Sequence, residues 1–574
     1  MKETQKKILI TFSFSLIYGI CVLFIGLIIS FTLFYVGIDN QYLNKIEGGV
    51  DRIIYEEIVL HYKFNDPIYI QFINYLLNFF KGDWGNSYVV APGMKTIDLL
   101  SDAFSHTIVI AIFPIIIGVG GIKLGKIWAR KTDRIQGKII QIFTTIALAT
   151  PIFFIGNLMQ YIFQDTLPIS NYILAIISLS FVFIAIIIKQ TCISLENKDP
   201  NVAFVSNSFI AAKLFGYIFA MIILLEIIFQ LPGFGYNFIM SIYFGDLFVN
   251  NSSIFIIVIL FTFTIFLSNL VPIGYKFLRE KAPKLFELFH IRDDFQSTRP
   301  DQPTEMVPKR DVNLRIELKN YGLAIVKNPY TIVGLGLIVF FIIISLFPQL
   351  FTPYKLQELV KPYFPDEAPF SSPSEAHPLG TTKYGYDLLA RLIWGTRDAF
   401  IFGSLVLLIG LIGGSFFGVL ASKFHGNIYN IIIGFMIVFF IIPAFWFFII
   451  ISPVFDRNVA VLVFGIGIFL VIIFIQIIAN AIRYRTDYLD MAKRIIKYIP
   501  LEMAFAILLY QSLGFIGLAD ERTAQLGTSL SYGRAEFEIF RVNIWPSFFI
   551  FLIMLSLILL HEGLNTSIRQ KEVL

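Results

Sequence analysis

The chain has 574 residues, of which 56% are hydrophobic and only 15% charged, and its formal net charge is +5. A soluble protein carries about 25% charged residues, so this composition excludes an ordinary soluble enzyme. The apolar runs are roughly 18–25 residues long, which suits membrane-crossing helices and excludes the short alternating strands of a β-barrel. The small net charge gives no reason to expect nucleic-acid binding.

Twelve apolar runs are predicted to cross the membrane as helices, which makes the fold an all-α polytopic membrane protein embedded in the lipid bilayer. The predicted spans are residues 8–37, 104–122, 139–163, 171–189, 212–230, 253–275, 331–350, 399–421, 430–453, 459–480, 502–519 and 545–562.

The distribution of Lys and Arg predicts the orientation of these spans. Six basic residues and one acid lie between residues 123 and 138, and five basic residues lie between 481 and 500. In the longer segment 38–103 the acids outnumber the bases. We therefore expect segments 38–103 and 351–398 to lie outside and both termini to lie inside.

The chain divides into two halves around a polar stretch that contains Pro300 and Pro303 and reads as a flexible linker. The predicted domains are 1–280 and 326–574, with residues 281–325 as the cytoplasmic linker. Each half has one span, a long outer segment, a polar stretch with an amphipathic surface helix, and then five spans. Six spans per half give both halves the same orientation, so the halves form a parallel pseudo-repeat.

The polar stretch of the second half runs from His377 to Arg397 and opens with turn residues. It is predicted to continue as an amphipathic helix along the membrane surface, before the eighth span begins at residue 399. The apolar face of this helix holds Leu388, Leu389, Leu392 and Ile393.

This stretch resembles the segment that leads into the second span of one permease of the dipeptide, oligopeptide and nickel ABC importers. The departures from that family pattern are Thr382, Tyr386 and Ala390. The first half is similar to the partner permease of the same systems, which has the motif G-D-x-G-x-S at this place. The matching residues, which we call the outer elbow, are Gly82, Asp83, Gly85, Gly380, Thr381, Gly385, Asp387 and Arg391.

Two further segments resemble the ends of the fifth span in the two permeases. They are residues 226–235 in the first half and 513–518 in the second half. The resemblance implies that they shape the outer gate or the pathway. Glu226 either lines the pathway or caps the turn that follows it, and the glycines either shape a gate or form an ordinary turn. The candidate residues are Glu226, Pro232, Gly233, Gly235, Gly514 and Gly517.

The resemblance implies two permeases fused in one chain, with a pathway for peptides or similar small solutes, in a bacterial inner membrane. It also implies separate cytoplasmic ATPase subunits and an extracytoplasmic substrate-binding protein as partners. No Gly-Lys-Ser/Thr phosphate-binding motif occurs in the sequence. We therefore expect no enzymatic activity, no catalytic or metal site and no cofactor, since any ATP would be bound by the partner subunits.

The cytoplasmic loops that contact the ATPases in this family are reduced here. In the second half a degenerate start of the coupling motif remains, but about ten residues are absent before Pro500, and the first half keeps no recognisable motif. The retained residues are Asp487, Tyr488, Met491, Ala492, Lys493 and Arg494.

Two other functions follow from these departures. One is a non-transporting membrane scaffold that anchors extracytoplasmic partners. The other is a secondary transporter driven by an ion gradient, which would call for more intramembrane carboxylates than Glu226 alone.

Overall fold

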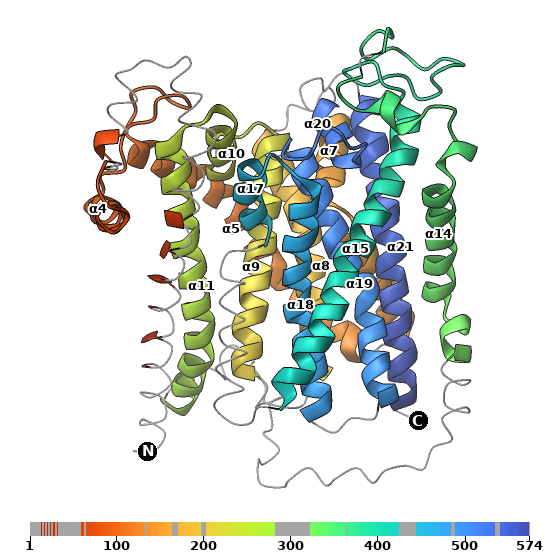
Figure 1. Ribbon diagram of the computed structural model, residues 1–574. Coiled ribbons are helices and arrows are strands. Elements are labelled where there is room, and N and C mark those ends of the chain that lie inside the picture. The colour runs from red at the N-terminus through yellow and green to blue at the C-terminus, as the bar shows by residue number, and fades with distance from the viewer. Residues whose placement is uncertain are drawn as a thin grey trace.

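A computed structural model describes the chain at residues 59–61, 63, 65–130, 134–163, 170–196, 203–281, 322–363, 365–423, 444–483, 488–533 and 540–572, with scattered positions between 13 and 32. All extended regular elements in these ranges are helices, accompanied by two isolated β-bridges. The structure therefore confirms an all-α polytopic fold (Figure 1).

The helices of the first half are α4 (Ile68–Lys81), α5 (Thr96–Arg130), α6 (Ile135–Ala149), α7 (Ile152–Phe163), α8 (Asn171–Glu196), α9 (Ala203–Ile228), α10 (Phe234–Phe244) and α11 (Leu247–Lys281). Those of the second half are α14 (Pro329–Leu346), α15 (Leu388–Ser422), α17 (Ala444–Val454), α18 (Val459–Arg483), α19 (Tyr488–Phe515), α20 (Leu526–Gly533) and α21 (Phe540–Glu572), with short 3-10 turns at Pro348–Leu350 and Leu356–Leu359.

Eight helices of the described chain are long and apolar enough to cross a membrane: α5, α8, α11, α14, α15, α18, α19 and α21. The third predicted span is a pair, α6 and α7, bent by 93°. The apolar part of α9 is shorter and covers Gly216–Ile228. The count of twelve is not confirmed, because most of 8–37 and of 430–453 lies outside the described residues, as does nearly all of the linker 281–325.

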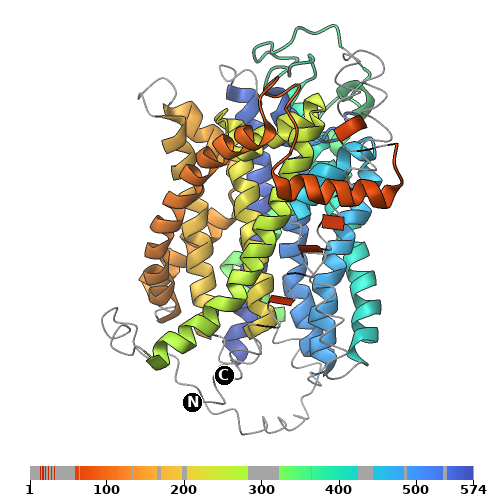
Figure 2. The same cartoon turned by 90° about the vertical axis from the view of Figure 1, so that its left-hand side faces the viewer.

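The predicted surface helix at 388–398 is wrong. Leu388 begins α15, a single helix of 35 residues that continues into the span. Leu388, Leu392 and Ile393 are buried in the protein core rather than facing a membrane surface. In the first half, α4 lies crosswise to the long helices near their outer end (Figure 2), and it precedes the polar turn instead of following it.

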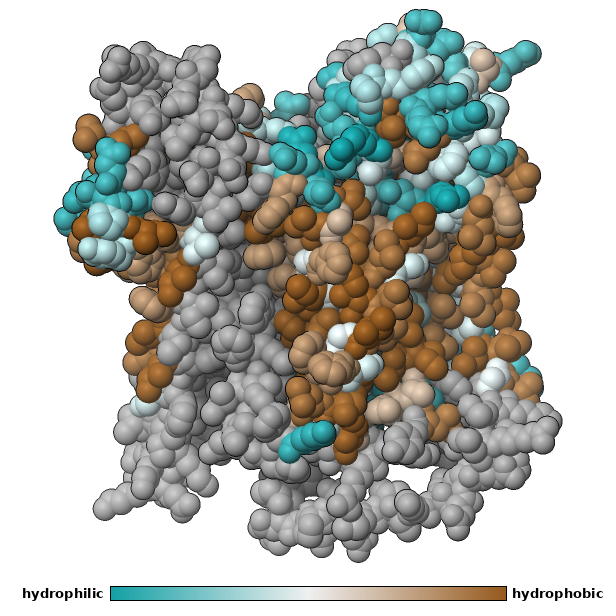
Figure 3. All heavy atoms as spheres, viewed as in Figure 1, coloured by the Kyte–Doolittle hydropathy of each residue, from teal (hydrophilic) through white to brown (hydrophobic). Residues whose placement is uncertain are grey.

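The outward faces of the long helices carry apolar side chains, and polar residues gather above them over the outer segment of the second half (Figure 3). We call the end of the molecule with this polar cap the outer end and the opposite end the inner end. α21 ends on the inner side (Figure 1).

Glycines on one face of a long helix form a seam with a second helix in each half. In the first half Gly118, Gly121 and Gly125 of α5 face α8, and a Cβ at any of them would press on that helix. In the second half Gly410, Gly413, Gly414 and Gly418 of α15 face α18 in the same way. Small residues allow membrane helices to approach closely, so the two halves use the same packing at corresponding places.

Candidate functional site

The outer turn of the first half is built on two glycines with left-handed backbone. Gly82 ends α4 with φ 76°, and its N–H bonds to the carbonyls of the last helical turn. Gly85 has φ 74°, and a Cβ there would overlap the ring of Phe248. Glycine accepts this backbone region without a steric penalty, which explains both glycines of the motif. The side chain of Asp83 between them is exposed.

A buried carboxylate holds this turn against α11. Asp246 is fully buried, and its Oδ2 accepts a 2.6 Å bond from the Ser87 hydroxyl. The same oxygen accepts from the backbone N–H groups of Tyr88, Val89 and Val90 at 3.1–3.2 Å. Charge-assisted bonds of this kind are the stronger class of hydrogen bond, so Asp246 fixes the loop after Ser87 in one geometry.

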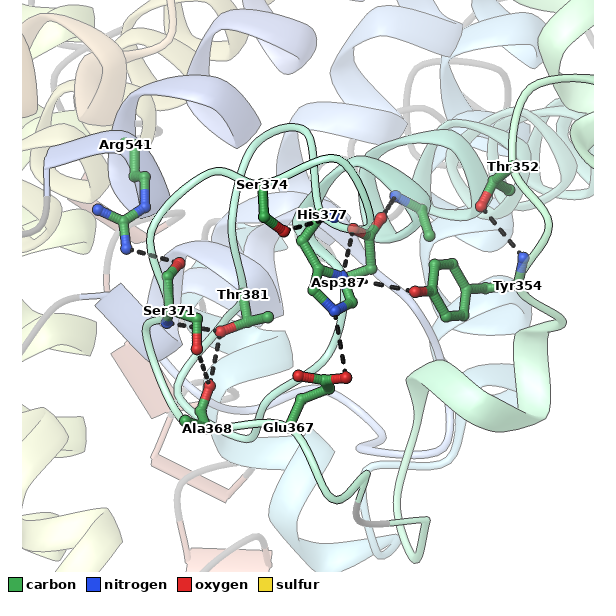
Figure 4. Close-up of polar contacts among 11 residues, drawn as sticks. Thr352, Tyr354, Glu367, Ala368, Ser371, Ser374, His377, Thr381, Asp387 and Arg541 are labelled. Carbon is green, nitrogen blue, oxygen red and sulfur yellow. Dashed lines mark hydrogen bonds and ion pairs between the residues drawn. The ribbon is translucent and has the colours of Figure 1, made fainter.

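The outer turn of the second half is also built on two glycines with left-handed backbone. Gly380 has φ 79° and Gly385 has φ 77°, and a Cβ at either would overlap a carbonyl oxygen, of Ser371 or Glu367. The Thr381 hydroxyl accepts from Ser371 N–H at 2.7 Å and donates to the Ala368 carbonyl at 2.8 Å. The loop before the turn is thereby tied to it (Figure 4).

The two turns are structurally equivalent. The Thr96 N–H donates to the Gly85 carbonyl at 3.0 Å, and the Leu388 N–H donates to the Gly380 carbonyl at 3.0 Å. Each turn is closed by an isolated antiparallel bridge, Asn86 with Lys95 and Thr381 with Asp387. A helix of 35 residues follows each one. The outer elbow thus shares a left-handed glycine, a closing backbone bond and a bridge in both halves, although the two closed segments differ in sequence and length.

A small polar network surrounds the second turn (Figure 4). Asp387 caps α15 by accepting from Ala390 N–H at 2.6 Å, and its second oxygen lies 3.0 Å from His377 Nδ1. Glu367 lies 3.6 Å from the other ring nitrogen. Burial, together with the charges of Asp387 and Glu367, raises the pKa of Tyr354 above its ordinary value. These contacts hold the beginning of α15 to the outer segment.

Arg391 is fully buried one turn into α15. Its Nε donates to Ser529 Oγ of α20 at 2.9 Å, and its Nη1 donates to the carbonyl of Leu359. The guanidinium lies 5.5 Å and 5.2 Å from the ring centres of Tyr386 and Tyr532. Arginine suits such a stacked, multiply bonded position better than lysine. Arg391 therefore joins the outer segment to α20, and it does not face solvent.

Glu226 caps the short outer helix α10. It is fully buried, with Oε1 accepting from the Thr107 hydroxyl at 2.6 Å and Oε2 accepting from Tyr236 N–H at 3.0 Å. A Cβ at Gly233 would overlap this carboxylate, and one at Gly235 would touch it. The geometry favours the capping interpretation of Glu226 in this conformation. Pro232 precedes the helix, and its carbonyl accepts from Asn237 Nδ2 at 3.4 Å.

The second half repeats this cap with a neutral side chain. Gln511 Oε1 accepts from Gly527 N–H at 2.8 Å at the start of α20. Gly514 lies against Gln525, and Gly517 has φ 78° and lies against the Tyr243 hydroxyl, which donates to the Ile516 carbonyl. Since Tyr243 belongs to α10, Gly517 lies where the outer ends of the two halves meet. Its role in a gate remains a prediction.

The inner residues of the coupling motif lie in a helix and not in a loop. Tyr488 begins α19, and this helix continues through Pro500 to Phe515, so it extends inward beyond the predicted span 502–519. Lys493 pairs with Asp490 at 2.9 Å within the helix, while Arg494 is exposed. Met491 and Ala492 are half-buried, and Asp487 lies outside the described residues. Pro is tolerated in membrane helices where neighbours satisfy the freed carbonyl.

The connections between these inner helix ends are short. Residues 197–202 link α8 to α9, and residues 484–487 link α18 to α19. The structure does not describe these residues, and the loss of coupling-loop length stays a prediction.

Sequence reasoning overlooked several buried charged residues, of which Asp246, Lys189 and Glu562 matter most for the contacts of the bundle. A charged residue inside an apolar run, or at its border, is the sequence feature that could have identified them. Among the described residues, no three His, Cys, Asp or Glu side chains converge to hold a metal ion.

Comparisons of the sequence with known proteins find similar transport permeases. The chain is similar to the glutathione transport system permease protein GsiD of Pectobacterium atrosepticum, with 25% identity over 287 residues, covering 46% of this chain and 94% of that protein. It is 23% identical over 302 residues to the dipeptide transport system permease protein DppC of Haemophilus influenzae, covering 47% and 98%. A probable peptide ABC transporter permease of Sinorhizobium fredii, y4tP, is 27% identical over 112 residues, covering 19% and 35%. No protein-family profile matches the chain.

These homologues are permease components of peptide-type ABC importers, and none supports a non-transporting scaffold. The two long matches cover nearly the whole of each relative but only about half of this chain. That proportion is consistent with two permeases fused in one chain.

Proposed function

Because this chain is homologous to the permeases of peptide-type ABC importers, we propose that it forms the complete membrane-spanning part of such an importer. The two halves would supply the two permeases that line a translocation path for peptides or similar small solutes. The relatives' printed names refer to glutathione, dipeptides and peptides, which supports small peptides and similar solutes as the substrate class.

The equivalence of the two outer turns carries this proposal. Both turns have a left-handed glycine, a closing bridge and a 35-residue helix that packs through glycines on a partner helix. A single permease with an unrelated extension would not reproduce these features at corresponding places. The match to half of the chain and the repeated geometry therefore support a fusion.

Energy would come from partner ATPases, because the sequence has no phosphate-binding loop of its own. The exposed Arg494 and its neighbours at the inner end of α19 are the candidate contact in the second half. With only a few residues between the inner helix ends, docking would involve the helix ends themselves rather than a separate coupling helix. A substrate-binding protein would deliver solute at the outer end.

The chain is a multi-pass membrane protein, and we place it in a bacterial inner membrane with both termini in the cytoplasm. The excess of basic residues in 123–138 and 481–500 supports this orientation. Tagging either terminus and testing its accessibility in intact cells measures it directly.

Uptake of a labelled peptide by a deletion strain tests the proposed function. The full chain should restore ATP-dependent uptake, and so should its two halves co-expressed as separate chains divided within residues 282–321. Each half expressed alone should not restore uptake. Uptake that is unchanged by the deletion, or that one half restores, contradicts a two-permease path.

A further inference from the structure

An ion pair joins the two halves inside the helix bundle. Lys189 of α8 and Glu562 of α21 are in direct contact through Nζ and Oε1. The two side chains are only 15% and 5% exposed. The Lys189 ammonium also lies 5.2 Å from the ring centre of Trp128 in α5, and Trp128 is itself buried. Three helices from both halves therefore enclose this pair.

The pair lies toward the inner end of the bundle. α8 starts at the outer end, where Asn171 donates to the Phe229 carbonyl at 3.1 Å. α21 also starts there, where Arg541 donates to the Ser371 carbonyl at 2.9 Å. At 1.5 Å per residue, Lys189 lies about 27 Å along α8, and Glu562 lies about 32 Å beyond Arg541 along α21. Both distances approach the ~30 Å thickness of the hydrocarbon core.

Nearer the outer end the halves meet through neutral contacts. Tyr243 donates to the Ile516 carbonyl, and Asn157 Nδ2 donates to Ser547 Oγ at 3.3 Å. The rings of Tyr161 and Phe540 stack with centres 3.5 Å apart, and those of Phe153 and Phe515 stack at 5.8 Å. Separating neutral groups such as these leaves no isolated charge in the bundle. A buried ion pair differs, because moving one partner away leaves an uncompensated charge in a low-dielectric region. The inner contact is thus either formed or broken.

We propose that Lys189 and Glu562 form a latch that holds the inner ends of the two halves together, and that inward opening of the path breaks this ion pair. The inference rests on the proposed function, because a permease must open toward the inside at some stage. Charges inside membrane helices are costly, and this pair has no part in the outer elbow or in the capping of α10. A two-state contact across the moving interface gives the two charges a role.

The distance between the inner ends of the halves tests the latch without any need for transport. Spin labels at Lys126 of α5 and Arg494 of α19, both exposed, would report this distance in the full chain in lipid nanodiscs, with the two native cysteines replaced by alanine. In Glu562→Gln the ratio of open to closed inner ends should rise at least about tenfold, because one charge of a buried pair is left alone. A distance distribution equal to that of the parent protein overturns the proposal.

Two further variants separate a latch from a general loss of stability. Exchanging the charges, with Lys189→Glu and Glu562→Lys together, should return the distribution toward the parent, and an exchange variant as open as Glu562→Gln overturns the latch. Glu521→Gln makes the same chemical change at an ion pair that lies within one half, that of Glu521 with Lys361 at 2.9 Å at the outer end. It serves as the matched control and should leave the distribution unchanged.

A crosslink provides a measurement that does not depend on weakening the fold. Cysteines at positions 189 and 562, joined by a short reducible crosslinker, should block peptide uptake in vesicles, and a reducing agent should restore it. Full uptake by the crosslinked chain overturns the latch. If the parent chain, without these substitutions, shows no uptake at all, the proposed function fails, whereas the spin-label result still decides whether the two charges hold the inner ends.

Discussion

Asp246 is expected to stabilise the outer turn of the first half far more than the motif residue Asp83 does. One oxygen of Asp246 accepts from the Ser87 hydroxyl and from three successive backbone N–H groups. Asp246→Asn keeps the size of the side chain but removes the charge. If the amide oxygen of Asn occupies the position of Oδ2, each hydrogen bond becomes one between neutral groups. If the NH2 group occupies it, that group faces the hydroxyl and N–H donors and no hydrogen bond forms with the N–H groups.

The magnitude follows from the number of bonds. Hydrogen bonds to a charged group contribute about 1.5–3 kcal/mol and neutral ones about 0.5–1.5 kcal/mol. A loss of roughly 1 kcal/mol at each of the three backbone N–H bonds gives about 3 kcal/mol for the local opening of the turn. Since about 1.4 kcal/mol corresponds to a factor of ten, the amides of Tyr88, Val89 and Val90 should exchange with solvent about 100-fold faster.

Hydrogen exchange of the full chain in detergent or nanodiscs, read by mass spectrometry on a peptide covering residues 86–95, measures this effect. Asp83→Asn is the matched control, because the Asp83 side chain is exposed in the same turn, and it should change exchange by less than about threefold, the size of a surface effect. If Asp246→Asn exchanges as slowly as the parent, the carboxylate does not hold the turn and the reasoning is refuted.

Three other substitutions test the packing and the caps. Gly380→Ala forces a Cβ into a backbone with φ 79° against a carbonyl oxygen and should destabilise by about 1–3 kcal/mol, seen as a lower apparent Tm in detergent. Gly414→Leu should weaken the α15–α18 seam by at least about 1–3 kcal/mol through overpacking, with a matching fall in Tm. Gly336→Ala, on a helix face with no neighbour within 4 Å, is the control for both and should leave Tm unchanged, so an equal fall in all three would contradict both predictions. Glu226→Ala should leave the N–H groups of α10 without their acceptor and increase their exchange roughly tenfold or more, and unchanged protection would show that Glu226 is not a cap.

The sequence predicted the helical class and the existence of the eight long apolar helices, though not all of their ends, because a long apolar run in a bilayer has few alternatives to a helix. The glycine-rich turns were also identified, because only glycine readily adopts φ values such as those of Gly85 and Gly380. Their equivalence across the halves could be predicted only in outline. It depends on the backbone hydrogen bonds Thr96–Gly85 and Leu388–Gly380. Such bonds do not require particular side chains, so the sequence does not reveal them.

Two kinds of error had physical causes. The expected surface helix at 388–398 failed because an amphipathic pattern does not reveal whether its apolar face meets lipid or protein, and Leu388 and Leu392 meet protein. The continuity of α19 was missed because the polar residues before Pro500 end the apolar run, while the helix continues through that proline. Asp246 and the pair Lys189–Glu562 were overlooked because their partners lie more than 150 residues away, and no local pattern links such residues.

The most direct test of an energised permease is purification of the tagged full chain from its native membrane in mild detergent. A permease driven by partner subunits predicts that an ABC ATPase co-purifies in fixed stoichiometry and that its ATP turnover changes when this chain is present. A chain that purifies without any ATPase, from cells whose peptide uptake does not depend on it, would contradict a role in transport.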